Sequence, residues 1–170
     1  DSMPKIDQYM MLTTGRNKLA DMAEIIVQKG YKRVMVFCNQ KYTTAMLANQ
    51  MARLNFVVDC LHGDLSQAER NKIMGEFKAG NIAVLVATDV AARGIDVSGI
   101  QVVFNYDIPQ ENDAYLHRIG RTGRAKHTGE AYVLYTKEEH KRVRDMLRYT
   151  RNTATPIAFD ESRSIIPGTF

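Results

Sequence analysis

"NIAVLVATDVAARGID" spans residues 81–96 and joins an apolar run directly to a polar loop. The run at residues 84–87 is short and unbroken by polar side chains. Such a run is typical of a strand covered on both faces, as in a parallel sheet. The loop after it brings together Thr88, Asp89, Arg93, Gly94 and Asp96. In an open parallel sheet, ligands bind at this edge, beyond the carboxyl ends of the strands.

The same pattern recurs along the chain and alternates with helices. Further apolar runs lie at residues 34–38, 57–61, 102–105 and 131–135, and residues 6–12 are predicted to form a further edge strand. Apolar residues at helical spacing predict helices at residues 18–29, 43–54, 66–78, 111–119 and 137–149. Ser66 with Glu69, and Thr136 with Glu139, have the spacing of capping boxes. This alternation predicts an α/β fold with a mainly parallel, doubly wound sheet.

The alternating pattern sets the expected domain boundaries. Residues 6–149 carry it and are predicted to form one domain. We interpret residues 1–5 as a remnant of a linker or of cloning. Residues 150–170 are polar, contain two prolines and are predicted to be a flexible or partly ordered extension.

The composition suits a soluble globular protein. The 170 residues carry a net charge of +4, with 45% hydrophobic and 25% charged residues. No apolar run approaches the length of a membrane span, so we expect no membrane association. Cys38 and Cys60 lie in apolar runs and are expected to be reduced core thiols, and no histidine has a metal-ligand spacing with them. We therefore predict no metal bound by this chain, a monomer, and a cytoplasmic location, or a nuclear or nucleolar one in a eukaryote.

Three polar stretches carry candidate chemistry. In "TDVAARGID", Gly94 permits close backbone approach, Asp96 can accept bonds from sugar hydroxyls, and Thr88 can bind a phosphate. In "HGDLSQAER", Gln67 and Arg70 share one face at the start of a helix, an end that favours anions. Taken alone, each stretch also fits a solvated polar surface.

The third stretch is "HRIGRTGR", residues 117–124. Gly120 is expected to end the preceding helix, so that Arg121 and Arg124 lie on a glycine-rich loop and converge on one point. Arginine presents a planar fork that matches phosphate oxygens, which suits the charge of a transferring phosphoryl group. The alternative is a basic surface loop without a ligand.

Together with "VFCN" at residues 36–39, these stretches closely resemble, in order, the motifs of the C-terminal RecA-like domain of DEAD-box RNA helicases. The resemblance covers roughly residues 6–147 and implies a three-layer α/β/α RecA-like fold, related to P-loop NTPases. It implies that Arg121 and Arg124 are arginine fingers for ATP and that Gly94 and Asp96 lie beside its ribose. It implies RNA-backbone contacts for Gly63, Gln67, Arg70 and Thr88. It also implies that Arg93, His117 and Arg118 contact a partner domain and couple nucleotide to RNA.

The sequence contains neither G-x-x-x-x-G-K-[ST] nor an Asp-Glu-Ala-Asp box. The resemblance thus implies half an enzyme, with ATP and Mg²⁺ held mainly by an absent N-terminal RecA-like domain. We expect negligible ATPase activity from this chain alone. Two alternatives remain open at this stage: a stand-alone RNA- or protein-binding module, and a DNA-directed translocase domain.

Overall fold

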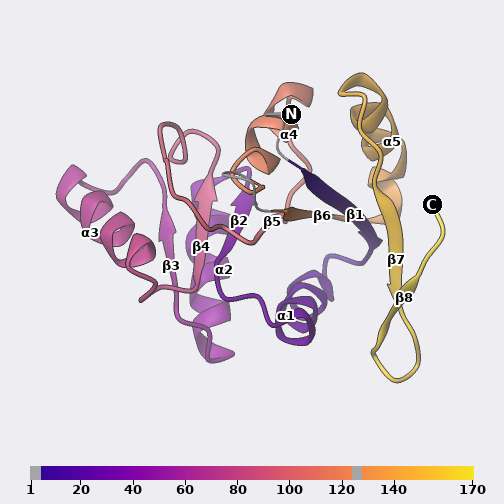
Figure 1. The fold of residues 1–170 in the computed structure, drawn as a ribbon, viewed down its shortest axis with the longest axis horizontal. Helices are drawn as coiled ribbons and strands as arrows, with labels where there is room; N and C mark the ends of the chain where they lie inside the picture. The colour runs from indigo at the N-terminus through magenta and orange to yellow at the C-terminus, as the bar shows by residue number, and fades with distance from the viewer. Residues whose placement is uncertain (1–4, 124–127) are drawn as a thin grey trace.

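The protein is described by a computed structural model that covers residues 5–123 and 128–170. These residues form one sheet of eight strands in the order β3-β4-β2-β5-β6-β1-β7-β8 (Figure 1). The strands are β1 (Ile6–Leu12), β2 (Val34–Cys38), β3 (Val58–Leu61), β4 (Val84–Thr88), β5 (Val102–Asn105), β6 (Gly129–Tyr135), β7 (Thr155–Phe159) and β8 (Ile165–Pro167). All neighbouring pairs are parallel except β7 with β8.

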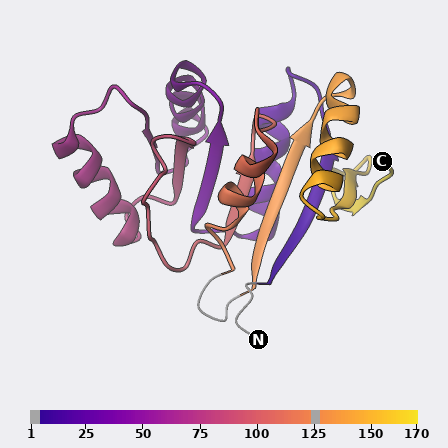
Figure 2. The same cartoon turned by 90° about the horizontal axis from the view of Figure 1, so that it is seen from above.

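Helices cover both faces of the sheet, as Figures 1 and 2 show. On one face lie α1 (Lys18–Lys29) and α2 (Lys41–Arg53), and on the other lie α3 (Gln67–Lys78), α4 (Asn112–Ile119) and α5 (His140–Tyr149). The predicted three-layer α/β/α fold with a mainly parallel sheet is confirmed. The helix expected at residues 137–149 begins with a short 3₁₀ turn, η1 (Lys137–Glu139), before α5.

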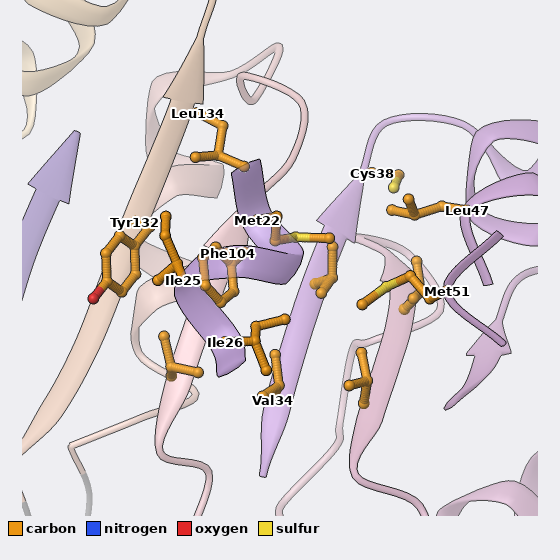
Figure 3. Packing of buried hydrophobic residues seen from close by; sticks show 14 of the residues in the cluster. Met22, Ile25, Ile26, Val34, Cys38, Leu47, Met51, Phe104, Tyr132 and Leu134 are labelled. Atoms are coloured by element: carbon orange, nitrogen blue, oxygen red, sulfur yellow. The ribbon is translucent and has the colours of Figure 1, made fainter. Parts of the chain in front are cut away.

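The unbroken apolar runs follow from this layering. Along β2, Val34, Val36 and Cys38 contribute to the core beneath α1 and α2, whereas Met35 and Phe37 contribute to a core on the opposite face. Each β2 side chain is at most 1% exposed. In Figure 3, residues of α1 and α2 meet Val34, Phe104, Tyr132 and Leu134 of the sheet. Because both faces are covered, every position of such a strand favours an apolar side chain.

The two predicted capping boxes are both present. Ser66 accepts a bond from the Glu69 amide, and the Glu69 carboxylate accepts one from the Ser66 amide, at the start of α3. Thr136 and Glu139 make the reciprocal arrangement before α5. These caps satisfy amide groups that have no partner within the helix.

The position of β1 differs from the prediction. The expected edge strand lies inside the sheet, parallel to β6 on one side and to β7 on the other. The sequence could not reveal this position because β7 lies in the segment 150–170, which has no clear strand pattern. The two edges of the described sheet are β3 and β8, and Cys60 on β3 is only half-buried, unlike the fully buried Cys38.

The segment after α5 is ordered in this structure and extends the sheet as the hairpin β7–β8. Its turn docks on α1, where Arg163 donates to the carboxylate of Asp21 at 2.9 Å. Thr13 donates to the other oxygen of Asp21 at 2.6 Å, and the Arg163 guanidinium lies 4.1 Å from the centre of the Phe159 ring. The hairpin is thus joined to the domain by backbone pairing and by a largely buried carboxylate.

Candidate functional site

The carboxyl ends of β2, β4 and β5 converge on the side chain of Arg118. Asn39 follows β2, Asp89 follows β4, and Asp107 follows β5. Arg118 comes from the last turn of α4, on the face of the sheet opposite to α1 and α2. The parallel order of these strands places their ends at one edge, as the sequence predicted.

The Arg118 guanidinium is fully enclosed and makes five hydrogen bonds within the domain. It donates to both oxygens of Asp89, from Nε at 2.7 Å and from Nη2 at 2.8 Å. It also donates to Oδ1 of Asn39 at 2.7 Å, to the carbonyl of Asp107 at 2.6 Å, and to Oδ1 of Asn105 at 3.4 Å. The charge is therefore neutralised by a bidentate carboxylate, the strongest pairing available to arginine.

The side chain of Arg118 has no exposed surface and binds groups of its own domain. The contact with a partner domain that the resemblance implies for Arg118 stays a prediction. His117, next along α4, is exposed and lines a cavity. Arg118 also joins the segments that follow three strands, and Asp89 in one of these segments lines the same cavity.

The cavity has a volume of about 330 Å³ and lies against α4 and the loop after β4. Four candidate residues line the cavity, namely Arg93, His117, Arg118 and Arg121. Three acidic side chains line it as well, namely Asp89, Glu111 and Asp113. The wall therefore carries both cations and carboxylates. This arrangement suits a ligand or partner that presents both a phosphate and basic groups.

Arg121 lies in a turn that begins at the end of α4. Gly120 is helical rather than left-handed, and the Arg121 amide donates to the Arg118 carbonyl at 3.2 Å. The Arg121 guanidinium donates to the Ile95 carbonyl at 2.5 Å. The predicted convergence of Arg121 with Arg124 concerns a residue outside those that the structure describes.

The loop of residues 88–96 borders the cavity. Gly94 has φ = +77°, which agrees with the expected need for glycine at this position. The Thr88 hydroxyl accepts a bond from the Ala91 amide at 3.3 Å and thus caps the loop after β4. Asp96 is exposed, as a residue that binds sugar hydroxyls must be.

The start of α3 approaches the same loop. Arg70 donates to the Arg93 carbonyl at 3.2 Å, so the predicted RNA-contact helix and the predicted ATP loop touch. Gln67 donates to Asn71 at 2.9 Å on the exposed face of α3. Gly63 is exposed with open space around it, and neither Gly63 nor Gln67 lines the cavity.

The sequence did not single out Asn39, Asn105 or Asp107 as site residues. Asn39 binds three groups: its amide donates to Asp107, its side-chain nitrogen donates to the Ile108 carbonyl, and its oxygen accepts from Arg118. The available signal was a polar residue directly after each buried strand. Cys38 lies nearby at the end of β2. Its own burial raises the pKa of the thiol to about 12, which makes a nucleophilic role for this cysteine unfavourable.

The residues present fit one side of a nucleotide rather than a metal ion. Arg93 and Arg121 offer donors for phosphate oxygens. Asp89 is placed as a Mg²⁺-binding carboxylate would be, but the Arg118 fork already binds both of its oxygens. Among residues 5–123 and 128–170, no group of three or more His, Cys, Asp or Glu side chains could hold a metal. Likewise, no helix in these ranges is long and apolar enough to cross a membrane.

Known proteins resemble this chain over most of its length. The family described as "Helicase conserved C-terminal domain" matches residues 17–126. The ATP-dependent RNA helicase FAL1 of Scheffersomyces stipitis is 46% identical over 117 residues, which cover 69% of this chain and 29% of that protein. The chain spans less than a third of the length of the curated relatives it matches.

Solved structures of the same family share the fold. The DEAD-box protein SrmB of E. coli, bound to regulator of ribonuclease activity A, superposes with a TM-score of 0.87 at 35% identity, covering 99% of this chain and 98% of that one. The S. cerevisiae Dbp5 structure with RNA and ADP BeF3 gives a TM-score of 0.80 at 29% identity, covering 92% and 42%. The family match, the relatives and the fold agree with the four motifs. The chain therefore belongs to the helicase conserved C-terminal domain family, and it is the C-terminal RecA-like domain of a DEAD-box helicase.

Proposed function

We propose that this domain is the second half of an ATP-dependent enzyme that unwinds or remodels RNA. The observation that carries the proposal is that Arg93, His117 and Arg121 line one cavity beside the loop of residues 88–96. The chain has cations for a phosphate but no phosphate-binding loop of its own. This combination supports a domain that completes a nucleotide site held mainly by another RecA-like domain, which also supplies most ligands of Mg²⁺.

On the nucleotide side, Arg121 and Arg124 act as arginine fingers on the terminal phosphate. They stabilise charge that develops in the transition state, and they do so only when the two domains close. Gly94 and Asp96 lie beside the ribose. His117 and Arg93 face the partner domain, and Arg118 acts behind them by holding the loops in place.

On the RNA side, Gly63, Gln67, Arg70 and Thr88 contact the sugar-phosphate backbone. Support comes from the N-terminus of α3, where the helix dipole and Arg70 favour phosphate. Binding through the backbone reads shape and charge, so it is not sequence-specific and weakens with salt. The relative Dbp5 has been solved with RNA bound.

The test compares the 170-residue chain with a two-domain protein that also carries the ATP-binding domain. We expect RNA-stimulated ATP hydrolysis from the two-domain protein and none above background from this chain. In the two-domain protein, Arg121→Ala should lower turnover about 10³-fold, as removal of an arginine finger does. Arg53→Ala is the matched control, because Arg53 is exposed at the end of α2 on the opposite face of the sheet.

Two results would reject this function. Robust RNA-stimulated turnover by the 170-residue chain would show that no second domain is needed. Near-normal turnover in Arg121→Ala would remove the finger role. Competition between RNA and DNA of the same sequence distinguishes an RNA enzyme from a DNA-directed translocase. We further propose a cytoplasmic, monomeric protein, which cell fractionation and light scattering test.

A further inference from the structure

The turn that carries Arg121 is packed on the segment that leads into β1. Residues 121–123 follow α4, and Lys5 and Ile6 begin the described part of the chain, more than a hundred residues earlier. The Gly129 amide donates to the Lys5 carbonyl at 2.9 Å, which fixes this segment to the start of β6. The turn and the start of β1 are therefore neighbours in space although they are distant in sequence.

Gly123 lies directly against this segment. It has φ = +71°, and a Cβ added there would lie 2.7 Å from the Lys5 carbonyl oxygen and 2.9 Å from Cγ1 of Ile6. Side-chain carbons do not approach a backbone oxygen so closely, and the backbone cannot move aside cheaply. Glycine is thus required at position 123 for two reasons: the backbone has a positive φ, and there is no room for a side chain.

Gly129 closes the contact from the other side. A Cβ there would collide with Oγ1 of Thr122 and with the Gly123 amide nitrogen. Thr122 is 1% exposed, and its hydroxyl donates to the Ile100 carbonyl just before β5. The turn is consequently enclosed by the starts of β1, β5 and β6.

The other end of the turn is fixed by α4. The Arg121 amide donates to the Arg118 carbonyl, and the Thr122 amide donates to the Ile119 carbonyl at 3.1 Å. Arg118 itself is bound to Asp89. Arg121 is therefore held between an anchored helix end and the backbone of Lys5 and Ile6, with little freedom to shift alone.

We propose that the backbone of Lys5–Ile6 is the seat that positions the arginine turn, and that Thr122, Gly123 and Gly129 are positioning residues for Arg121. None of these three contacts the cavity-lining surface itself. A displacement of the chain ahead of β1 moves the seat and hence the turn. The effect on ATP turnover rests on the proposed function of Arg121, whereas the effect on the turn itself does not.

The first experiment uses the 170-residue chain and needs no ATP. Proteolytic removal of residues 1–5, which leaves Ile6 as the first residue, removes the Lys5 carbonyl, and removal of residues 1–4 keeps it. Hydrogen exchange of the Arg121 and Thr122 amides should become at least about tenfold faster in the longer deletion only. Exchange in β2 and β4, far along the sheet, should stay unchanged. Lys5→Ala should behave like the unaltered chain, because the contact uses the backbone and not the side chain.

The exchange experiment can either support or overturn the proposal. Faster exchange confined to the turn and to Gly129 supports the seat. Unchanged exchange at Arg121 and Thr122 in the longer deletion overturns it. An equal loss of protection in β2 and β4 also overturns it, because the segment would then act only on global stability.

The second experiment measures catalysis in the two-domain protein. Gly129→Ala pushes against Thr122 and Gly123, so kcat should fall by about tenfold or more while the KM for ATP stays within about twofold. Gly75→Ala is the matched control, since a Cβ at Gly75 meets nothing within 4 Å. An unchanged kcat in a folded Gly129→Ala protein would reject the proposal. If Gly129→Ala does not fold, Thr122→Val replaces it, because this change removes the bond to the Ile100 carbonyl and keeps the shape of the side chain.

A double variant separates this proposal from the proposed function. If Gly129 acts through Arg121, the pair Gly129→Ala with Arg121→Ala should turn over no more slowly than Arg121→Ala alone. Multiplicative losses would contradict a positioning role. If Arg121→Ala alone has near-normal turnover, the finger role fails, and the exchange experiment still decides whether the seat exists.

Discussion

Arg118 and Asp89 form a two-pronged ion pair, with Nε to Oδ1 at 2.7 Å and Nη2 to Oδ2 at 2.8 Å. The guanidinium is fully buried, while the Asp89 side chain is 38% exposed toward the cavity. The pair ties the end of α4 to the end of β4, and therefore ties the turn of Arg121 to the loop of residues 88–96. The ion pair thus links two motifs that are separate in sequence.

Replacing Arg118 should destabilise the domain. Arg118→Ala leaves Asp89, Asn39 and Asn105 without their donor, and we expect a loss of about 3 kcal/mol in the free energy of unfolding. Arg118→Lys should cost less, because it keeps the charge but not the fork. Urea unfolding measures both. The free energy of unfolding of Arg53→Ala should stay within about 0.5 kcal/mol of the parent. An equally small loss for Arg118→Ala would contradict the stabilising role of the Arg118 hydrogen bonds.

The two partners in the hairpin contact should respond unequally. Arg163 is 48% exposed, so Arg163→Ala should cost only about 1 kcal/mol after solvent screening. Asp21 is 11% exposed and accepts bonds from both Thr13 and Arg163. Asp21→Ala should therefore cost about 2 kcal/mol, since it leaves the buried Thr13 hydroxyl with only its long bond of 3.4 Å to the Thr14 carbonyl. Thermal unfolding of both variants checks the order, and a larger loss for Arg163→Ala would contradict it.

Stability on the acid side should depend on Glu69. Hydrogen bonds from the Ser66 backbone and side chain lower the pKa of this carboxyl below its ordinary value of 4.5. Because the folded pKa is the lower one, this stabilisation is complete above pH 4.5 and is lost as the pH falls through the folded pKa. Glu69→Gln keeps a capping acceptor but cannot titrate, so its stability relative to the parent should rise in acid. Parallel pH profiles of unfolding for the two proteins would reject the contribution.

The two thiols should react at different rates. Burial raises the pKa of Cys38 to about 12, so almost no thiolate is present near neutral pH. Burial also raises the pKa of Cys60, with a smaller contribution from Asp59, but Cys60 is only half-buried on the edge strand β3. Iodoacetamide at pH 8 should label Cys60 first and Cys38 only on unfolding. Mass spectrometry follows the order, and faster labelling of Cys38 would contradict the burial argument.

Most of the fold was predictable because its signals are local. Runs such as Val34–Cys38 fill both faces of a covered strand, and the Ser66–Glu69 box starts a helix within four residues. The position of β1 was not predictable in this way. It depends on β7, whose sequence "TPIAF" contains a proline and no clear alternation, and which gains its strand structure from pairing with Met10 and its neighbours.

In the candidate site, too, the local features were predictable and the contacts between distant residues were not. The motifs predicted Arg121 and the loop around Gly94 from residues close in sequence. Asn39 and Arg118 are separated by 79 positions, and their bond follows only from the strand order. The burial of Arg118 was also hidden, because a sequence pattern does not distinguish an arginine that faces a ligand from one that binds its own domain.

The placement of β1 has a consequence for synthesis on the ribosome. Within this domain β1 is translated before its partners β6 and β7, which are made more than a hundred residues later. A nascent chain that ends before residue 129 carries β1 with both edges unpaired, and unpaired edges are templates for aggregation. The part of the sheet around β1 can therefore form only after β6 and β7 have been made, and until then residues 6–12 are open to non-native pairing.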